Sequence, residues 1–388
     1  MRTAARLRAF GTTIFTEMSA LATQTGAINL GQGFPDTDGA PEIVAATERA
    51  LRSGAANQYA PLAGVPELCA AIAAHQHRRY GLAVDPHDGV QVTFGATEAI
   101  AATMLGLLEP GDEVVVLEPF YDSYAAAIAM AGATRRLVTL RPPDFALDVG
   151  ALAAAARGAR MLVLNSPHNP TGRVLTRAEL EAVARACVDN DLIAVTDEVY
   201  EHLVFDGEHV PLATLPGMAE RTLTISSAGK SFSFTGWKIG WASGPPPLVG
   251  AVRSAKQFLS FAGGTPLQHA VAAALADAER HVGPLRAALQ ASRDRLCDGL
   301  GRLGMTVCVP EGGYFVNADI APLGEHDARR WCRALPARAG VVAIPTSAFY
   351  GDAGAAPTLV RFAFCKRPEV IDAALERLRD AHGVVAEP

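Results

Sequence analysis

The sequence predicts an α/β protein built on a mostly parallel sheet that lies between helices. Between residues 90 and 225, short apolar runs alternate with helical patterns, which is typical of such a sheet. Polar motifs follow several of these runs directly, and parallel sheets bind ligands beyond the carboxyl ends of their strands. The chain of 388 residues is long enough for two domains, and its hydrophobic fraction of 49% suits a large core.

The N-terminal quarter contains helical patterns, each of which stops at a glycine. A short strand and two glycines that allow close backbone approach are predicted within the sequence INLGQGFP, Ile28–Pro35. The predicted helices span 12–25, Pro41–Ser53 and Glu67–Tyr80.

The central part supplies the strands and helices of the sheet. Predicted strands are Val90–Phe94, Glu113–Leu117, Arg136–Leu140, Met161–Leu164, Leu192–Thr196 and Thr222–Ile225. Predicted helices are Thr97–Leu108, an alanine-rich stretch after EPFYDSY, and Arg177–Asp189.

The pattern changes after about residue 270. A long helical stretch, Ala270–Leu303, precedes strands predicted at Met305–Val309, Tyr314–Ala318, Val341–Ile344 and Leu359–Phe364. We therefore expect an N-terminal segment (1–40) that joins a small C-terminal domain (271–388), and a large domain between them (41–270).

Composition and charge exclude several classes of protein. The formal charge of −6 and the lack of a dense Lys/Arg run argue against a nucleic-acid binder. No apolar run is as long as a membrane span, and the first residues lack the apolar core of a signal peptide. Six scattered cysteines without metal-binding spacing indicate a reducing compartment, so we expect a cytoplasmic protein.

Lys230 follows the apolar run Thr222–Ile225 in the sequence SSAGKSFSFTGWKIGW. A lysine near a buried strand end has a lowered pKa, which is what a Schiff-base lysine requires. The nearby Ser226, Ser227 and Lys238 suit a phosphate group. The alternative is a surface turn in which the lysines only increase solubility.

Asp197 ends another apolar run, where an unpaired carboxylate is costly. A pyridinium nitrogen would satisfy it and would become an electron sink. A helix N-cap is the alternative role for Asp197. Tyr200 lies three residues further on and either donates to the same ligand or is a core tyrosine.

Three further segments lie at predicted strand ends. Asn169, in NSPHNPTG, is either an aimed amide donor or part of an Asn-Pro turn, and we interpret the adjacent His168 as a turn residue. Ala96 and Thr97 open a helix whose N–H groups can bind phosphate, although many strand–helix turns look similar. Tyr121 either stacks on an aromatic ring or packs in the core.

Arg361 lies on an apolar predicted strand of the small domain. A buried guanidinium needs a carboxylate, because it does not deprotonate. Either an internal acid or a substrate carboxylate can supply that partner.

The order of these motifs is more specific than any one of them. NPTG, Asp-x-x-Tyr, Ser-x-x-Lys with Gly-Trp-Lys, and a late Arg-Phe together resemble the class I/II aminotransferases, which are fold-type I enzymes dependent on pyridoxal 5′-phosphate (PLP). The resemblance runs from INLGQGFP to RFAFCK. The chain looks closest to the kynurenine/glutamine/methionine aminotransferase branch, and within it to actinobacterial N-succinyldiaminopimelate aminotransferases.

The resemblance implies a role for each matching residue. Lys230 is implied to form the Schiff base with PLP, Asp197 to pair with the ring nitrogen, and Arg361 to bind the substrate α-carboxylate. Tyr59 is implied to reach the phosphate of a neighbouring subunit in a homodimer. The remaining implied contacts are Tyr200 and Asn169 with the ring hydroxyl oxygen, Ala96, Thr97, Ser227 and Lys238 with the phosphate, Tyr121 with the ring face, and Asn169, Gly33 and Phe15 with the substrate.

The implied activity is transamination between an amino acid and a 2-oxo acid, with N-succinyl-LL-2,6-diaminopimelate as the expected donor and 2-oxoglutarate/glutamate as the paired couple. Gly263 and Gly264 are expected to leave room, or flexibility, where kynurenine-type enzymes carry a side chain, and Phe15 replaces a family tryptophan. The alternatives are a broad kynurenine/methionine/glutamine aminotransferase and a cysteine-S-conjugate β-lyase. A non-catalytic PLP-binding regulator is disfavoured because no basic helix-turn-helix segment is present. An inactive homologue is disfavoured because every catalytic residue type is in place.

Overall fold

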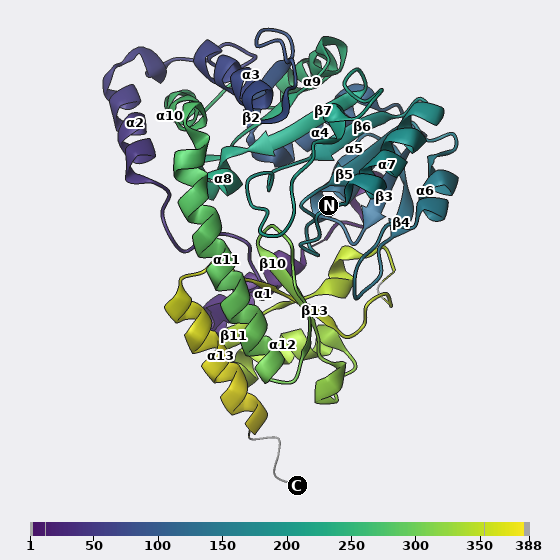
Figure 1. The fold of residues 1–388 in the computed structure, drawn as a ribbon, viewed down its shortest axis with the longest axis vertical. Coiled ribbons are helices and arrows are strands. Elements are labelled where there is room, and N and C mark those ends of the chain that lie inside the picture. The colour runs from purple at the N-terminus through teal and green to yellow at the C-terminus, as the bar shows by residue number, and fades with distance from the viewer. Residues whose placement is uncertain (1–2, 12, 353, 384–388) are drawn as a thin grey trace.

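The computed structural model describes residues 3–11, 13–352 and 354–383. Figure 1 shows a broad upper region around a large sheet and a narrower lower region, with the long helix α11 (Ala278–Arg302) running from one to the other. Of the helices described, none has the length and apolar character needed to cross a membrane.

A seven-stranded sheet with the order β2-β8-β7-β6-β5-β3-β4 forms the upper region. Only β8 runs against its neighbours, so the expected mostly parallel α/β sheet is confirmed. The strands are β2 (Val90–Phe94), β3 (Glu113–Glu118), β4 (Thr134–Thr139), β5 (Met161–Asn165), β6 (Ile193–Asp197), β7 (Thr222–Ser227) and β8 (Ile239–Ser243).

Helices cover both faces of this sheet because its strands are apolar on both sides. In β3, Val114 and Val116 pack toward one group of helices and Val115 and Leu117 toward another. The first face is covered by α4 (Gly95–Leu107), α5 (Asp122–Met130) and α9 (Pro246–Leu259). The remaining helices of this region are α2 (Pro41–Arg52), α3 (Pro66–Tyr80), α6 (Val149–Ala156), α7 (Arg177–Asp189), the single turn α8 (Ala228–Ser231) and α10 (Thr265–Ala276).

The lower region combines α1 and β1 with the C-terminal elements, whereas the short 3-10 helix Ala5–Leu7 packs on α5 of the upper region. A four-stranded antiparallel sheet has the order β12-β13-β10-β9, and β1 pairs with β11 in parallel. Helix α1 (Ile14–Thr25) packs on α12 (Ala328–Ala339) and β11. The other elements are β1 (Ile28–Asn29), β9 (Thr306–Cys308), β10 (Phe315–Asp319), β11 (Val341–Val342), β12 (Ile344–Pro345), β13 (Leu359–Ala363) and α13 (Pro368–Gly383).

Several element predictions are wrong in detail. The stretch Ala270–Leu303 is two helices rather than one, because Asp277 between α10 and α11 has non-helical dihedrals (φ −131°, ψ 54°). The predicted strand Val341–Ile344 is two short strands, because β11 pairs with β1 whereas β12 pairs with β13. Strand β8 and helices α6, α9, α12 and α13 were not predicted. The division at residues 40 and 270 stays a prediction.

Candidate active site

A cavity of about 480 Å³ opens at the carboxyl edge of the large sheet, and residues of the antiparallel sheet close its other side. Strands β5, β6 and β7 end here in register, with Asn165 beside Asp197 and Asp197 beside Ile225. The residues that the sequence predicts for the site line this cavity, except Tyr59 and Ser226; the hydroxyl of Ser226 instead donates to Glu201, so its expected contact with a phosphate is wrong. The predicted residues that line the cavity are Phe15, Gly33, Ala96, Thr97, Tyr121, Asn169, Asp197, Tyr200, Ser227, Lys230, Lys238 and Arg361.

Lys230 lies on α8, one turn beyond the end of β7. Its Nζ donates a hydrogen bond of 2.7 Å to the carbonyl oxygen of Gly33, and its own carbonyl accepts one of 3.0 Å from the Tyr314 hydroxyl. Burial lowers the pKa of Lys230 to about 8, and the nearby positive charge of Arg361 acts in the same direction. The surface-turn alternative for this lysine is therefore wrong.

Gly33 is required where it approaches Lys230. A Cβ atom at this position would lie 2.3 Å from the Phe315 ring, which is far inside van der Waals contact. Only glycine therefore brings this carbonyl to the lysine without moving Phe315.

Asp197 is buried at the end of β6 and is not a helix N-cap. The Tyr124 hydroxyl donates a hydrogen bond of 2.6 Å to its Oδ2. Burial raises the pKa of Asp197 to about 6, although the hydrogen bond from Tyr124 acts in the opposite direction. Among the residues that the structure describes, no cation lies within ion-pair distance of Asp197, so the carboxylate has room for a cationic ligand.

Asn165 fixes the loop that carries Asn169. Its amide nitrogen donates to the carbonyl of Asp197 at 2.7 Å, and its Oδ1 accepts from the Asn169 backbone N–H at 2.7 Å. The side chain of Asn169 is thereby held at the cavity wall, where its Oδ1 accepts from Arg361 Nη1 at 3.1 Å.

Arg361 lies on β13 with only 1% of its surface exposed. Its Nη2 donates to the carbonyl of Gly31 at 2.8 Å, its Cζ lies 3.8 Å from the centre of the Phe315 ring, and its buried Nε has no partner. In the part of the chain that the structure describes, Arg361 forms no ion pair, so the internal-acid alternative is not realised. The guanidinium therefore remains available for a carboxylate ligand.

The opposite end of the cavity suits a phosphate. The first N–H groups of α4, at Ala96 and Thr97, have no partner within the helix. Lys238 lies close to the start of α4: its Nζ would be 3.1 Å from a Cβ atom placed on Gly95. With Lys230, Lys238 and Arg361 against Asp197, the cavity holds an excess of positive charge.

These features fit PLP, since the donor set supplies one group for each part of the cofactor. Lys230 offers an amine for the aldehyde, Asp197 a buried carboxylate for the ring nitrogen, and the start of α4 an anion site for the phosphate.

Other observations change the expectations from sequence. The space beside Gly263 is not open, because a Cβ there would lie 2.0 Å from the Phe94 ring. Gly264 has φ +65° and, with Gly263 and Tyr59, lines a separate surface hollow. Tyr59 is 82% exposed and packs edge-on against Phe261, so its predicted role in a neighbouring subunit stays a prediction.

Sequence reasoning missed Tyr124 and Asn165. Tyr124 lies one helical turn after Tyr121 in EPFYDSY, and Asn165 begins NSPHNPTG, so both lay inside motifs already singled out. His168 is a buried turn residue as interpreted, with its Nδ1 2.8 Å from the Thr171 hydroxyl.

Comparisons with known proteins agree with this geometry. The family model for aminotransferase class I and II matches residues 25–378. The probable N-succinyldiaminopimelate aminotransferase DapC of Mycobacterium tuberculosis is 53% identical, over 97% of this chain and 98% of that protein. The solved structure of N-succinyldiaminopimelate aminotransferase from Mycobacterium tuberculosis superposes with a TM-score of 0.96 at 54% identity. The match covers 98% of this chain and 100% of that chain.

More distant relatives have other named substrates. Methionine aminotransferase of Escherichia coli is 39% identical, over 96% of this chain and 97% of that protein. Kynurenine–oxoglutarate transaminase 3 of Mus musculus is 36% identical, over 97% of this chain and 90% of that protein.

Proposed function

The chain belongs to the class I and II aminotransferases, which in general depend on PLP, and from this premise we propose that PLP binds in the cavity around Lys230. The convergence of Lys230, Asp197 and Arg361 on one cavity is the observation that carries this proposal. Asp197 lies on β6, Lys230 on α8 and Arg361 on β13, and together they provide a buried carboxylate, an amine and a carboxylate-binding cation.

The proposed cofactor contacts follow the layout of the cavity. Ser227, Lys238 and the backbone of Ala96 and Thr97 hold the phosphate, and Tyr121 lies against the ring. Tyr200 and Asn169 contact the ring hydroxyl oxygen, and Asp197 holds a proton on the ring nitrogen. When bound, PLP supplies an aldehyde that condenses with amines and a ring that withdraws electrons from the substrate Cα.

Lys230 acts as the general base. Its lowered pKa gives the amine a much larger unprotonated fraction near neutral pH than an ordinary lysine has, so that Nζ can take a proton from the substrate Cα and return it to the cofactor side. Arg361 binds the α-carboxylate, with Asn169 and the backbone near Gly33 beside it, and this fixes the Cα–H bond relative to Lys230.

For the substrate, we propose N-succinyl-LL-2,6-diaminopimelate as donor and 2-oxoglutarate as acceptor, as part of lysine biosynthesis. The support is the 53% identity to the M. tuberculosis relative that bears this substrate in its name, compared with 39% and 36% for the methionine and kynurenine enzymes. A cysteine-S-conjugate β-lyase would use the same lysine and aspartate but would release pyruvate and ammonia.

An acceptor-dependence assay separates the two reactions. The purified chain loaded with PLP is incubated with each donor, with and without 2-oxoglutarate, while glutamate, pyruvate and ammonia are measured. Turnover that requires 2-oxoglutarate and yields equimolar glutamate supports the aminotransferase. Continuous release of ammonia without an acceptor would show a lyase instead.

We also propose a homodimer with shared active sites, in which Tyr59 reaches the phosphate bound by the partner. The support is that exposed Tyr59 packs against Phe261, which is itself 45% exposed, since exposed apolar side chains that cluster are usually covered by a partner. A monomeric particle in light scattering would refute this. The free cysteines of the described chain support a cytoplasmic location.

A further inference from the structure

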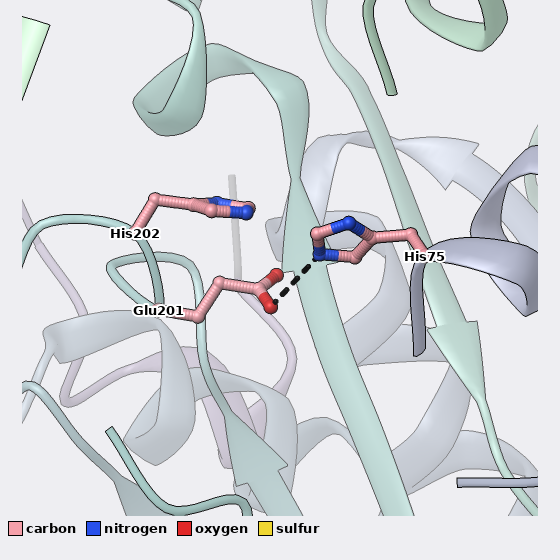
Figure 2. A group of neighbouring side chains, drawn as sticks. All are labelled: His75, Glu201 and His202. Carbon is pink, nitrogen blue, oxygen red and sulfur yellow. Dashed lines mark hydrogen bonds and ion pairs between the residues drawn. The ribbon is translucent and has the colours of Figure 1, made fainter. Parts of the chain in front are cut away.

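A buried polar cluster lies behind the segments that carry the proposed cofactor ligands. Figure 2 shows His75, Glu201 and His202 converging on one another from two parts of the chain. Each of the three side chains is at most 3% exposed, and none of them lines the cavity. The proposed reaction therefore leaves this cluster without a function.

Two members of the cluster, and two serines that contact them, lie next to cavity residues in the sequence. Glu201 and His202 directly follow Tyr200, Ser226 precedes Ser227, and Ser231 follows Lys230. Along an extended strand, successive side chains point to opposite faces, so that Ser227 lines the cavity while Ser226 faces the cluster.

Two hydrogen bonds join these segments behind the cavity. The Ser226 hydroxyl donates to Glu201 Oε1 at 2.6 Å, and His202 Nδ1 and the Ser231 hydroxyl share a hydrogen bond of 2.9 Å. The bonds therefore connect the segment of Tyr200 to both sides of Lys230.

Helix α3 holds the carboxylate from the other side. The Tyr80 hydroxyl donates to Glu201 Oε2 at 2.8 Å, and His75 Nε2 lies 3.4 Å from the same oxygen. Burial acts to raise the pKa of Glu201, but the interaction with His202, and then the hydrogen bonds from His75 and Ser226, keep this pKa well below its usual range. Burial lowers the pKa of His202 to about 3, although the charge of Glu201 acts in the opposite direction.

We propose that Glu201 and His202 are positioning residues: through Ser226 and Ser231 they fix Tyr200, Ser227 and Lys230 relative to one another around the cofactor. This inference rests on the proposed PLP site. Neither residue touches the cavity, and the serine hydroxyls transmit their effect.

The test uses single serine substitutions with a matched control on the same strand. Thr224 lies two residues before Ser226 in β7, is equally buried, and hydrogen-bonds to Thr196 rather than to Glu201. The PLP-loaded variants Ser226→Ala, Ser231→Ala and Thr224→Val are compared for the Kd of PLP, the visible circular dichroism of the bound cofactor, and Tm.

We expect Ser226→Ala and Ser231→Ala to raise the Kd of PLP about three- to tenfold, as is typical for residues of one hydrogen-bond network, and to change the visible dichroism. Thr224→Val should lower Tm by about as much as the two serine substitutions do, but it should leave the Kd of PLP and the visible dichroism unchanged. Equal Kd values and equal spectra in all three variants would overturn the inference. A wild-type chain that does not bind PLP would instead overturn the proposed function.

A double-mutant cycle tests whether Ser226 acts through the carboxylate. In a Glu201→Leu background, Ser226→Ala should have little further effect on the Kd of PLP, because leucine offers no acceptor and both substitutions remove the same hydrogen bond. Fully additive effects would contradict the inference. The single serine variants keep it testable if Glu201→Leu does not fold. Finding a stoichiometric metal in the wild-type chain that is lost in His75→Ala would also overturn it, because the cluster would then be a metal centre.

Discussion

The hydroxyl of Tyr124 on α5 lies 2.6 Å from Oδ2 of Asp197 at the end of β6, and both groups are buried. This neutral donor is the principal side-chain partner of a carboxylate whose environment otherwise favours protonation. It therefore helps to keep Asp197 ionised for the nitrogen of the proposed cofactor ring.

Replacing Tyr124 by Phe should weaken both PLP binding and turnover. The hydrogen bond from Tyr124 lowers the pKa of Asp197, so its loss should raise that pKa above about 6. We expect a loss of about tenfold in kcat/KM at neutral pH, as for a lost hydrogen bond to a charged group. The matched control is Tyr350→Phe, which removes a buried hydroxyl bonded to the Leu140 carbonyl, away from the cavity. Equal losses in both variants would contradict the assigned role.

Lys230→Ala should abolish turnover and leave the fold intact. The side chain supplies the only amine that we place at the substrate Cα, and its removal breaks one hydrogen bond to Gly33. Measurements are the visible absorption of the PLP-treated protein and the cooperativity of thermal unfolding. A variant that keeps the wild-type absorption band and normal activity would refute the mechanism. Lys238→Ala, by comparison, should weaken PLP binding and retain measurable turnover.

The pKa of Lys230 predicts the pH dependence of its reactivity in the cofactor-free chain. Because this pKa is about 8 instead of 10.5, the free amine should react with acylating reagents with an inflection near pH 8. Between these two values the unfolded chain binds more protons than the folded chain, so the free energy of unfolding should rise with pH there. Peptide mapping of the four lysines in the sequence can follow the reaction. An inflection at pH 10 or above would contradict the geometry.

Arg361→Ala should weaken binding of the substrate α-carboxylate by roughly 2–3 kcal/mol, as expected for loss of a charge-assisted hydrogen-bonded pair. This corresponds to a rise in KM of about 30- to 150-fold for every amino donor. Arg361→Lys keeps the charge but loses the two-pronged donor, so it should recover only part of the loss. The assignment does not survive if KM for all donors stays at its wild-type value in Arg361→Ala.

Much of the large sheet could be predicted because its strands are continuous apolar runs bounded by polar motifs. Asp197 and Lys230 were recognised for the same reason, since Asp197 ends one such run and Lys230 lies shortly after another. Strand β8 was missed because the aromatic and glycine-rich sequence before it reads as a turn, while its pairing with β2 and β7 depends on distant residues.

Long-range contacts explain the other gaps. The partnership of Tyr124 with Asp197 joins positions 73 residues apart, and no local pattern encodes it. The expected room at Gly263 was wrong because the side chain that fills the space, Phe94, comes from another strand end. The sequence did not show whether Arg361 has an internal acid partner, because its neighbours in space, Asn169 and Gly31, are distant in the sequence.

The most direct test of the account is a half-reaction titration of the PLP-loaded chain, in which the visible spectrum reports conversion to the pyridoxamine form. The donors are N-succinyl-LL-2,6-diaminopimelate, glutamate, kynurenine, methionine and glutamine. We predict that the succinylated compound converts the cofactor at a much lower concentration than kynurenine, methionine or glutamine, and that glutamate also converts it. Preferential conversion by kynurenine, methionine or glutamine would contradict the proposed substrate and show a broad amino-acid aminotransferase.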